Sequence, residues 1–179
     1  MRLPASLQCI VLLPGLVLAA GATAVLAAGE STARIGSSLS ALDRGAYDCR
    51  ERGDRQICQA RGGTLRCRGL AVLAMTLEYE AELLRQVTVQ FDEGQFEDAV
   101  RQLEADFGAG AVHDEKIRAG MAGVIINRIR AWHERGQVQM LEQFSHGIGV
   151  SALYILSATD FETEMRRRQA MRVRGLRDL

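Results

Sequence analysis

Three evenly spaced cysteines constrain this chain more than any other feature of its sequence. Cys49, Cys58 and Cys67 follow one another at intervals of nine residues. The midpoints of the two intervals, at 53–54 and 62–63, are Gly-Asp and Gly-Gly. These dipeptides suit two-residue hairpin turns, because glycine accepts a positive φ without a Cβ clash. The spacing therefore predicts a three-stranded β-meander with all three cysteines in one cross-strand row.

A row of this kind predicts one disulfide and one remaining thiol. Directly opposite residues lie about 4.5–5.5 Å apart, within reach of a disulfide, and we expect Cys49 to bond to Cys58. Cys67 is left as an alternative partner or a free thiol, and Arg66 and Arg68 beside it would favour its thiolate. A structural bridge is the preferred interpretation, with a redox role for Cys67 as a second hypothesis. Three cysteines in a row, without a C-x-x-C motif, do not predict a metal site.

Residues 1–28 have the composition of a secretory signal peptide. Arg2 is their only charged residue, an apolar run follows over 10–18, and small residues come next. Cleavage after Ala28 would leave a periplasmic or secreted protein. The alternative is an uncleaved membrane anchor, because the uncharged segment is long enough to cross a bilayer. We expect residues 29–179 to form a single domain.

The rest of the chain alternates between strand and helix patterns. One or two helical turns are expected over 37–46, and the cysteine-bearing meander covers 47–68. After it come strands over 70–79 and 84–91, a helix over 96–107, strands over 124–132, 138–144 and 150–157, and a helix over 159–174. Residues 109–121 are expected to form a linker, and a short helix over 121–132 is the alternative to the strand there, because its alternation is imperfect. The order β-β-α-β-β-β-α over 69–179 predicts an α+β fold, an antiparallel sheet with two helices packed on one face, preceded by the meander.

The helix over 96–107 has the clearest pattern. Phe96, Val100, Leu103 and Phe107 are spaced four, three and four residues apart and form one apolar stripe. Gly108 follows where a left-handed C-cap is expected. The stripe predicts a helix that faces the core of the protein.

The terminal helix is expected to begin at a capping box formed by Thr159 and Glu162. Its acidic residues come first and its arginines last, an order that the helix dipole favours. This order accounts for the Arg-rich end of the chain. A second interpretation of the tail over 165–174 is a peripheral contact with an anionic membrane.

Three features from Leu70 onwards recur together in one type of protein. They are a strand hairpin, the motif F-x-x-A-V-x-x-L-x-x-x-F-G at 96–108, and a strand with Trp132 that leads to short strands including Ser151. In these features the chain resembles small exported bacterial α+β proteins of unknown function. It is more distantly similar to the helix-and-four-strand units of β-lactamase-inhibitor-like proteins and outer-membrane-assembly lipoproteins. The resemblance rests on packing residues, so it implies a fold and no catalytic residue.

The charge of the chain argues against a nucleic-acid partner. Lysine and arginine together number 22, as do aspartate and glutamate, so the formal net charge is zero, whereas a nucleic-acid binder is usually basic. This net charge of zero combines segments of opposite charge. The net charge is +4 over 44–68, −9 over 78–115 and +5 over 116–179. We expect these segments to pair within the fold.

Few residues carry recognisable chemistry. The chain has no nucleophile elbow, P-loop or dinucleotide-binding motif, and we predict no cofactor. His133, Glu142 and His146 would form a His-Glu-His metal site only if a hairpin brought them together, and each is more simply explained as a turn or surface residue. Glu78, Glu80 and Glu82 alternate along a strand in the pattern of a solvent-facing surface.

The sequence leaves two classes of function. The favoured one is a non-catalytic domain that binds another envelope protein or an envelope component through a sheet face or an exposed edge. The alternative is a small enzyme or thiol-redox protein whose site cannot be recognised from the sequence. A pocket in which His133, Glu142, His146 or Cys67 converge would favour the alternative.

Overall fold

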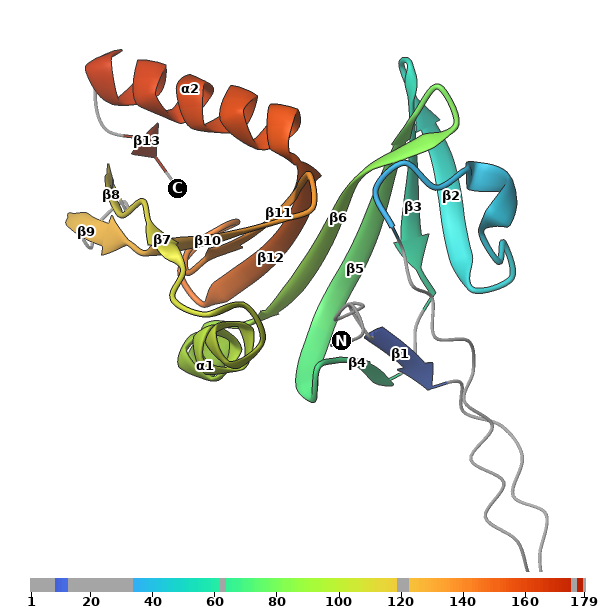
Figure 1. The fold of residues 1–179 in the computed structure, drawn as a ribbon, viewed down its shortest axis with the longest axis horizontal. Coiled ribbons are helices and arrows are strands. Elements are labelled where there is room, and N and C mark those ends of the chain that lie inside the picture. Colours follow the sequence, from blue (N-terminus) through green and yellow to red (C-terminus); the bar gives the residue numbers. More distant parts are fainter. Residues whose placement is uncertain (1–8, 13–33, 62–63, 119–122, 175–176, 179) are drawn as a thin grey trace, which may run out of the picture.

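The computed structural model has an α+β fold, as the sequence predicts. It describes residues 9–12, 34–61, 64–118, 123–174 and 177–178. Most strands belong to one antiparallel sheet, in which the order β1-β4-β5-β6-β12-β11-β10-β7 is joined by the β2–β3 pair along β5 (Figure 1). Two helices, α1 and α2, pack against this sheet. Of the predicted signal peptide, the structure describes only β1 (Cys9–Leu12), which pairs with β4.

The first cysteine hairpin forms in the predicted register. Strands β2 (Tyr47–Arg52) and β3 (Arg55–Ala60) are joined at Gly53, whose φ is +66°, and Cys49 lies opposite Cys58. The two cysteines form a disulfide. Ahead of the hairpin, a single 3-10 turn (Leu39–Ala41) is capped by the side chain of Ser38, in agreement with the expected helical turns.

The predicted row of three cysteines is wrong at its third member. Strand β4 (Thr64–Cys67) pairs with β1 and with β5 (Leu70–Glu80), where Cys67 faces Leu70. Strands β3 and β4 instead follow one another along the same edge of β5, because β5 has eleven residues and is long enough for two short partners. Cys67 is itself disulfide-bonded, which corrects the expected free thiol. The predicted Gly-Gly turn at 62–63 lies outside the described residues.

The centre of the sheet follows the predicted strands closely. β6 (Leu83–Asp92) returns from β5 through Ala81 and Glu82, which have φ values of +48° and +62°. The remaining strands of this sheet are β7 (Ala111–Val112), β10 (Ile129–Glu134), β11 (Gln137–Glu142) and β12 (Val150–Ser157). β12 lies between β6 and β11 and joins the two parts of the sheet.

The segment expected to be a linker and one long strand forms short strands instead. Residues 109–121 contain β7 and β8 (Glu115–Arg118), and the strand predicted over 124–132 is divided at Arg128 into β9 (Val124–Asn127) and β10. β9 and β8 form a second sheet with β13 (Arg177–Asp178). The division occurs where Arg128 Nε donates to Gln143 Oε1 at 2.8 Å and the chain passes from one sheet to the other.

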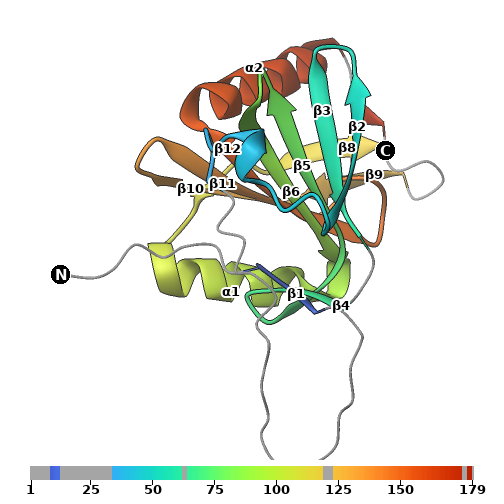
Figure 2. The same cartoon turned by 90° about the vertical axis from the view of Figure 1, so that its right-hand side faces the viewer.

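The two helices lie on opposite faces of the sheet, which corrects the expectation of a single covered face (Figure 2). Leu153 and Ile155 of β12 share a core with α1 (Phe96–Phe107), whereas Leu156 shares a second core with Phe161 of α2 (Ala158–Arg174). The physical reason is the continuous apolar run of β12, which is typical of a strand buried on both sides.

The end of α1 and the start of α2 are each marked by particular residues. The stripe of α1 faces the core through Phe96 and Leu103, and the helix ends at Phe107, followed by Gly108 with a φ of +79°. The start of α2 differs from the predicted Thr159 capping box. Ser157, the last residue of β12, accepts from the Asp160 backbone nitrogen at 3.0 Å and donates to the Asp160 carboxylate at 2.7 Å. The helix therefore follows directly from the strand.

Candidate functional site

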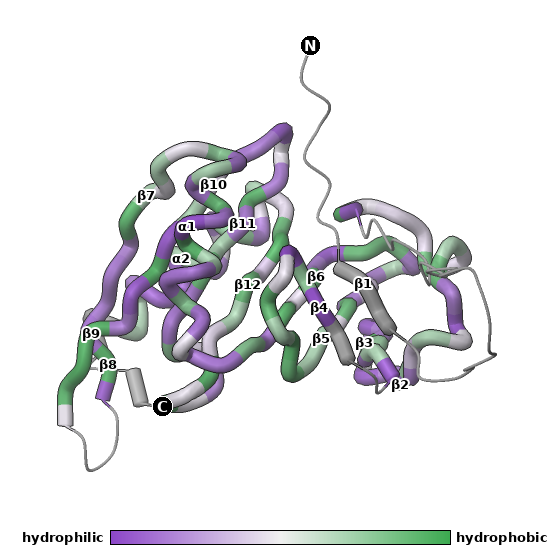
Figure 3. The backbone as a smooth tube through the Cα atoms, turned by 90° about the horizontal axis from the view of Figure 1, so that it is seen from below, coloured by the Kyte–Doolittle hydropathy of each residue, from purple (hydrophilic) through white to green (hydrophobic). Residues whose placement is uncertain are grey.

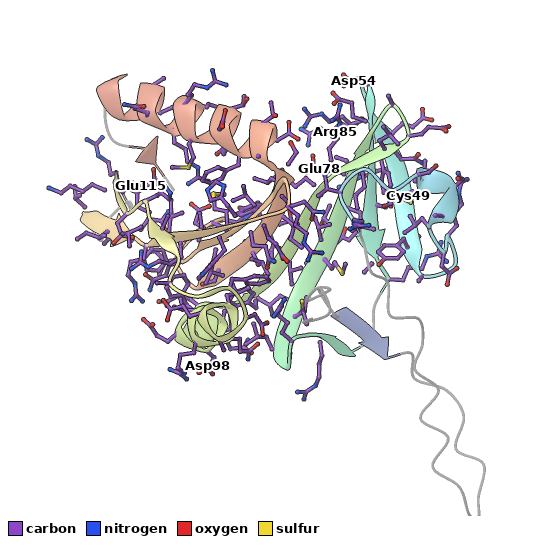
Figure 4. The ribbon with its side chains drawn as sticks, viewed as in Figure 1. Cys49, Asp54, Glu78, Arg85, Asp98 and Glu115 are labelled. Atoms are coloured by element: carbon purple, nitrogen blue, oxygen red, sulfur yellow. A yellow bond between two sulfur atoms is a disulfide. The ribbon has the colours of Figure 1, made fainter. Side chains whose placement is uncertain are left out.

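A pocket of about 410 Å³ lies beside α2 and strands β5, β6, β11 and β12. Figure 4 shows Glu78 and Arg85 on the side of the β5–β6 hairpin that faces α2. Its lining on β11 and β12 includes Met140, Tyr154 and Leu156, which we call the floor. The walls include Arg55, Glu78, Glu80, Arg85 and Gln86 from the β3, β5 and β6 side, His146 from the loop before β12, and Asp160, Thr163, Glu164, Arg167 and Arg168 from α2. An apolar floor with charged walls is a usual form for a ligand site.

The charges around the pocket are balanced. Each of three wall arginines has an acidic partner, and all three arginines are at least half exposed, so water or a ligand can compete for these contacts. The ion pairs are Arg55–Glu78 at 3.5 Å, Arg85–Glu80 at 3.2 Å and Arg167–Glu164 at 2.8 Å. Glu78 and Glu80 therefore belong to the pocket wall, whereas Glu82 lies in the turn.

A buried ionic cluster forms the inner end of this wall. Arg168 has 5% of its side chain exposed, and Glu142 and Glu115 have 0% and 2%. Arg168 Nη2 and Nη1 donate to the two carboxylate oxygens of Glu142 at 2.9 and 3.0 Å, and Nη1 also donates to Glu115 at 3.0 Å. Its Nε donates to Glu164 at 2.7 Å. The fork of one arginine thus joins α2 to strands of both sheets.

Asn127 completes the cluster. Its side-chain nitrogen donates to Glu142 at 2.7 Å and to Glu115 at 3.3 Å, and its oxygen accepts from the Phe144 backbone nitrogen at 2.9 Å. The residue is fully buried at the end of β9. Because both acids also accept from Arg168, the cluster holds them close together without leaving their charges unpaired.

Burial and hydrogen-bond partners also shift the pKa values of Glu164 and Arg168. Burial by itself would raise the pKa of Glu164, but hydrogen bonds from Arg167 and Arg168 outweigh it and lower this pKa below the usual value. Burial opposes the charge of Arg168, yet its bonds and proximity to Glu142 raise its pKa above that of a free arginine. Glu164 and Arg168 are therefore both charged at neutral pH.

The structure does not bring together His133, Glu142 and His146, the weak candidates for a His-Glu-His metal site. Glu142 is held by Arg168 and Asn127, and His133 packs edge-on against the ring of Phe161 with 5.3 Å between ring centroids. His146 lines the pocket. In the described part of the chain, no group of three histidine, cysteine, aspartate or glutamate side chains is placed to hold a metal ion.

Among the residues that the structure describes, the contact of His146 with Ser145 resembles part of a catalytic pair. Ser145 Oγ lies 2.9 Å and Gln90 Nε2 lies 3.0 Å from His146 Nδ1. An amide nitrogen can only donate, so Gln90 donates to Nδ1 in this arrangement, and the serine hydroxyl lies against the same ring nitrogen. His146 Nδ1 is thus in contact with two side chains, and one of them belongs to the adjacent residue Ser145. These contacts hold the loop before β12 in place.

Cys67 is not part of the pocket. It is buried with Leu70, Phe91 and Leu103 on the face of the sheet that packs against α1. A reactive thiolate at this position is not available while Cys67 is disulfide-bonded.

The sequence missed the Arg168 cluster entirely. In the sequence, Arg168 is one of several arginines at the basic end of the terminal helix. A local signal for the cluster is Glu164, four residues before Arg168. A second signal is a polar residue directly after apolar ones, since Asn127 follows Ile126 and Glu142 follows Leu141.

Comparisons with protein-family models, with curated proteins and with solved structures give no match. The function must therefore be argued from the residues of this chain alone.

Proposed function

We propose that this protein is a non-catalytic binding domain of the cell envelope. In this proposal residues 1–28 direct export, and the pocket beside α2 receives part of another envelope protein or an envelope component. The Cys49–Cys58 disulfide supports an oxidising compartment, which agrees with export. No helix in the described part of the chain is both long enough and apolar enough to cross a membrane.

The observation that carries the proposal is the pocket itself. It combines an apolar floor that includes Tyr154 with exposed ion pairs on its walls. A ligand that carries charges of both signs on an apolar body can lie on this floor and exchange its own charges with the wall pairs. A segment of polypeptide with mixed charge has this chemistry. Such an exchange needs no nucleophile, metal or cofactor.

The proposal is tested by blocking the pocket from α2. Thr163 is exposed and lines the pocket, whereas its neighbour Glu162 is exposed and is not among the lining residues. Thr163→Trp places an indole in the pocket, and Glu162→Trp places the same group on the helix outside it. The purified wild-type protein and the two variants are immobilised, and the envelope components that each one captures are identified by mass spectrometry.

The two variants are expected to give different results. Components captured by the wild type should be retained by Glu162→Trp and lost by Thr163→Trp, while both variants keep the circular dichroism spectrum of the wild type. Equal capture by Thr163→Trp and the wild type would show that the pocket is not the binding site.

A further inference from the structure

We propose that the outer face of the β8–β9 pair docks onto an anionic lipid surface. This outer face consists of Lys116 and Arg118 on β8 and of Val124 and Ile126 on β9. It belongs to the small sheet, separate from the pocket, and the proposal does not depend on the function proposed for the pocket. Figure 3 shows the hydrophobic colouring along β9 at one end of the molecule.

The alternation of the two strands produces this face. Glu115, Ile117 and Asn127 point inward and are buried, so the residues between them point outward. Val124 is 54% exposed and Ile126 is 58% exposed. β9 is an edge strand of its sheet, and no described element covers these two side chains.

Each exposed aliphatic side chain has a basic residue opposite it. The register pairs Lys116 with Ile126 and Arg118 with Val124. Residues 116–127 include these two basic residues and no acidic residue, whereas Asp178 of β13 lies opposite Arg118 on the other side of β8, so the charge that this face offers a partner is carried by Lys116. A basic side chain can lay its aliphatic stem on an apolar layer and keep its charge at the headgroups, so the pairing matches a lipid surface in which apolar and anionic groups lie close together.

The same charges disfavour the binding of a second copy of the chain to this face. Two copies packed face to face would bring their basic residues together, and this repulsion would oppose the gain from burying Val124 and Ile126. An anionic lipid surface would compensate the positive charge with its headgroups and bury the apolar side chains at the boundary of its acyl chains. The structure therefore favours lipid over self-association.

The test is co-sedimentation of the full chain with vesicles. The vesicles contain phosphatidylcholine with about 30% phosphatidylglycerol, and pure phosphatidylcholine vesicles serve as the neutral comparison. The wild type should bind the anionic vesicles, bind the neutral ones much more weakly, and be released when the salt concentration reaches about 0.5 M.

Two kinds of variant test the face itself. Lys116→Glu changes the charge by two units, and at about fivefold per unit this should weaken binding about 25-fold. Val124→Ser with Ile126→Ser removes the apolar part and should weaken binding by about tenfold or more. The matched controls are Arg50→Glu on β2 and Ile148→Ser, which is also 58% exposed, and neither should change binding. All substituted side chains are at the surface, so the melting temperature should change little.

The proposal is overturned if the wild type does not bind anionic vesicles, or if Lys116→Glu binds as well as the wild type. It is also overturned if the wild type is a dimer without lipid and Val124→Ser with Ile126→Ser makes it a monomer. That outcome would assign the face to self-association.

Discussion

Arg168 should be the most costly arginine of the chain to replace. Its guanidinium is 5% exposed and donates to Glu142, Glu115 and Glu164, so Arg168→Met removes every one of these contacts while filling a similar volume. The buried carboxylates of Glu142 and Glu115 then lose the arginine that neutralises them, while their hydrogen bonds from the amide of Asn127 remain.

The expected loss can be estimated from this geometry. Breaking a buried ion pair from one side costs about 3–5 kcal/mol, because the remaining charge is buried without compensation. For a chain of this size, each kcal/mol lowers the melting temperature by about 2–4 °C, so we expect a fall of roughly 10 °C. Adding Glu142→Gln to the Arg168→Met variant removes one of the stranded charges and should recover part of the loss.

Urea unfolding followed by circular dichroism measures this free energy. The control is Arg167→Met on the same helix, because Arg167 is 63% exposed and bonds only to Glu164 among the described residues. It should cost less than about 1 kcal/mol. If Arg168→Met costs no more than Arg167→Met, the buried cluster does not stabilise the fold and the reasoning fails.

Three further predictions follow from single contacts. The lowered pKa of Glu164 means that its stabilising effect is complete above the unfolded pKa of about 4.3 and is lost as the pH falls through the lower folded pKa, so Glu164→Gln should flatten the acid side of the stability profile. Peptide mapping of the unreduced protein should find Cys49 linked to Cys58, and replacing both by serine should cost about 2–3 kcal/mol; a Cys58–Cys67 link would contradict this. Gly110→Ala should cost about 1–3 kcal/mol and change the emission of the only tryptophan, because an added Cβ would lie 2.7 Å from the indole of Trp132; an unchanged spectrum and stability would contradict the close approach.

The elements that the sequence predicted well are those with strong local signals. The register of Cys49 and Cys58, the strand over 150–157 and the helix that begins at Phe96 all depend on turn residues or on regular apolar spacing. These signals are local, so one sequence is enough to recognise them.

The parts that were missed depend on contacts between distant segments. Cys67 does not lie in the predicted row because β4 pairs with β5 and not with β3. The eleven residues of β5 are enough for both short strands to pair along one edge. The helices lie on opposite faces because β12 is apolar on both sides, which periodicity alone does not distinguish from one buried face. Arg168 looked like a surface residue because its partner Glu142 is 26 residues away.

The most direct test of the proposed binding function is photo-crosslinking at the pocket in intact cells. A photoreactive phenylalanine analogue replaces Thr163, which lines the pocket, or Glu162, which does not. The proposal predicts a discrete crosslinked product from position 163 and none of the same mass from position 162. The same product from both positions, or none from position 163, would contradict binding in the pocket.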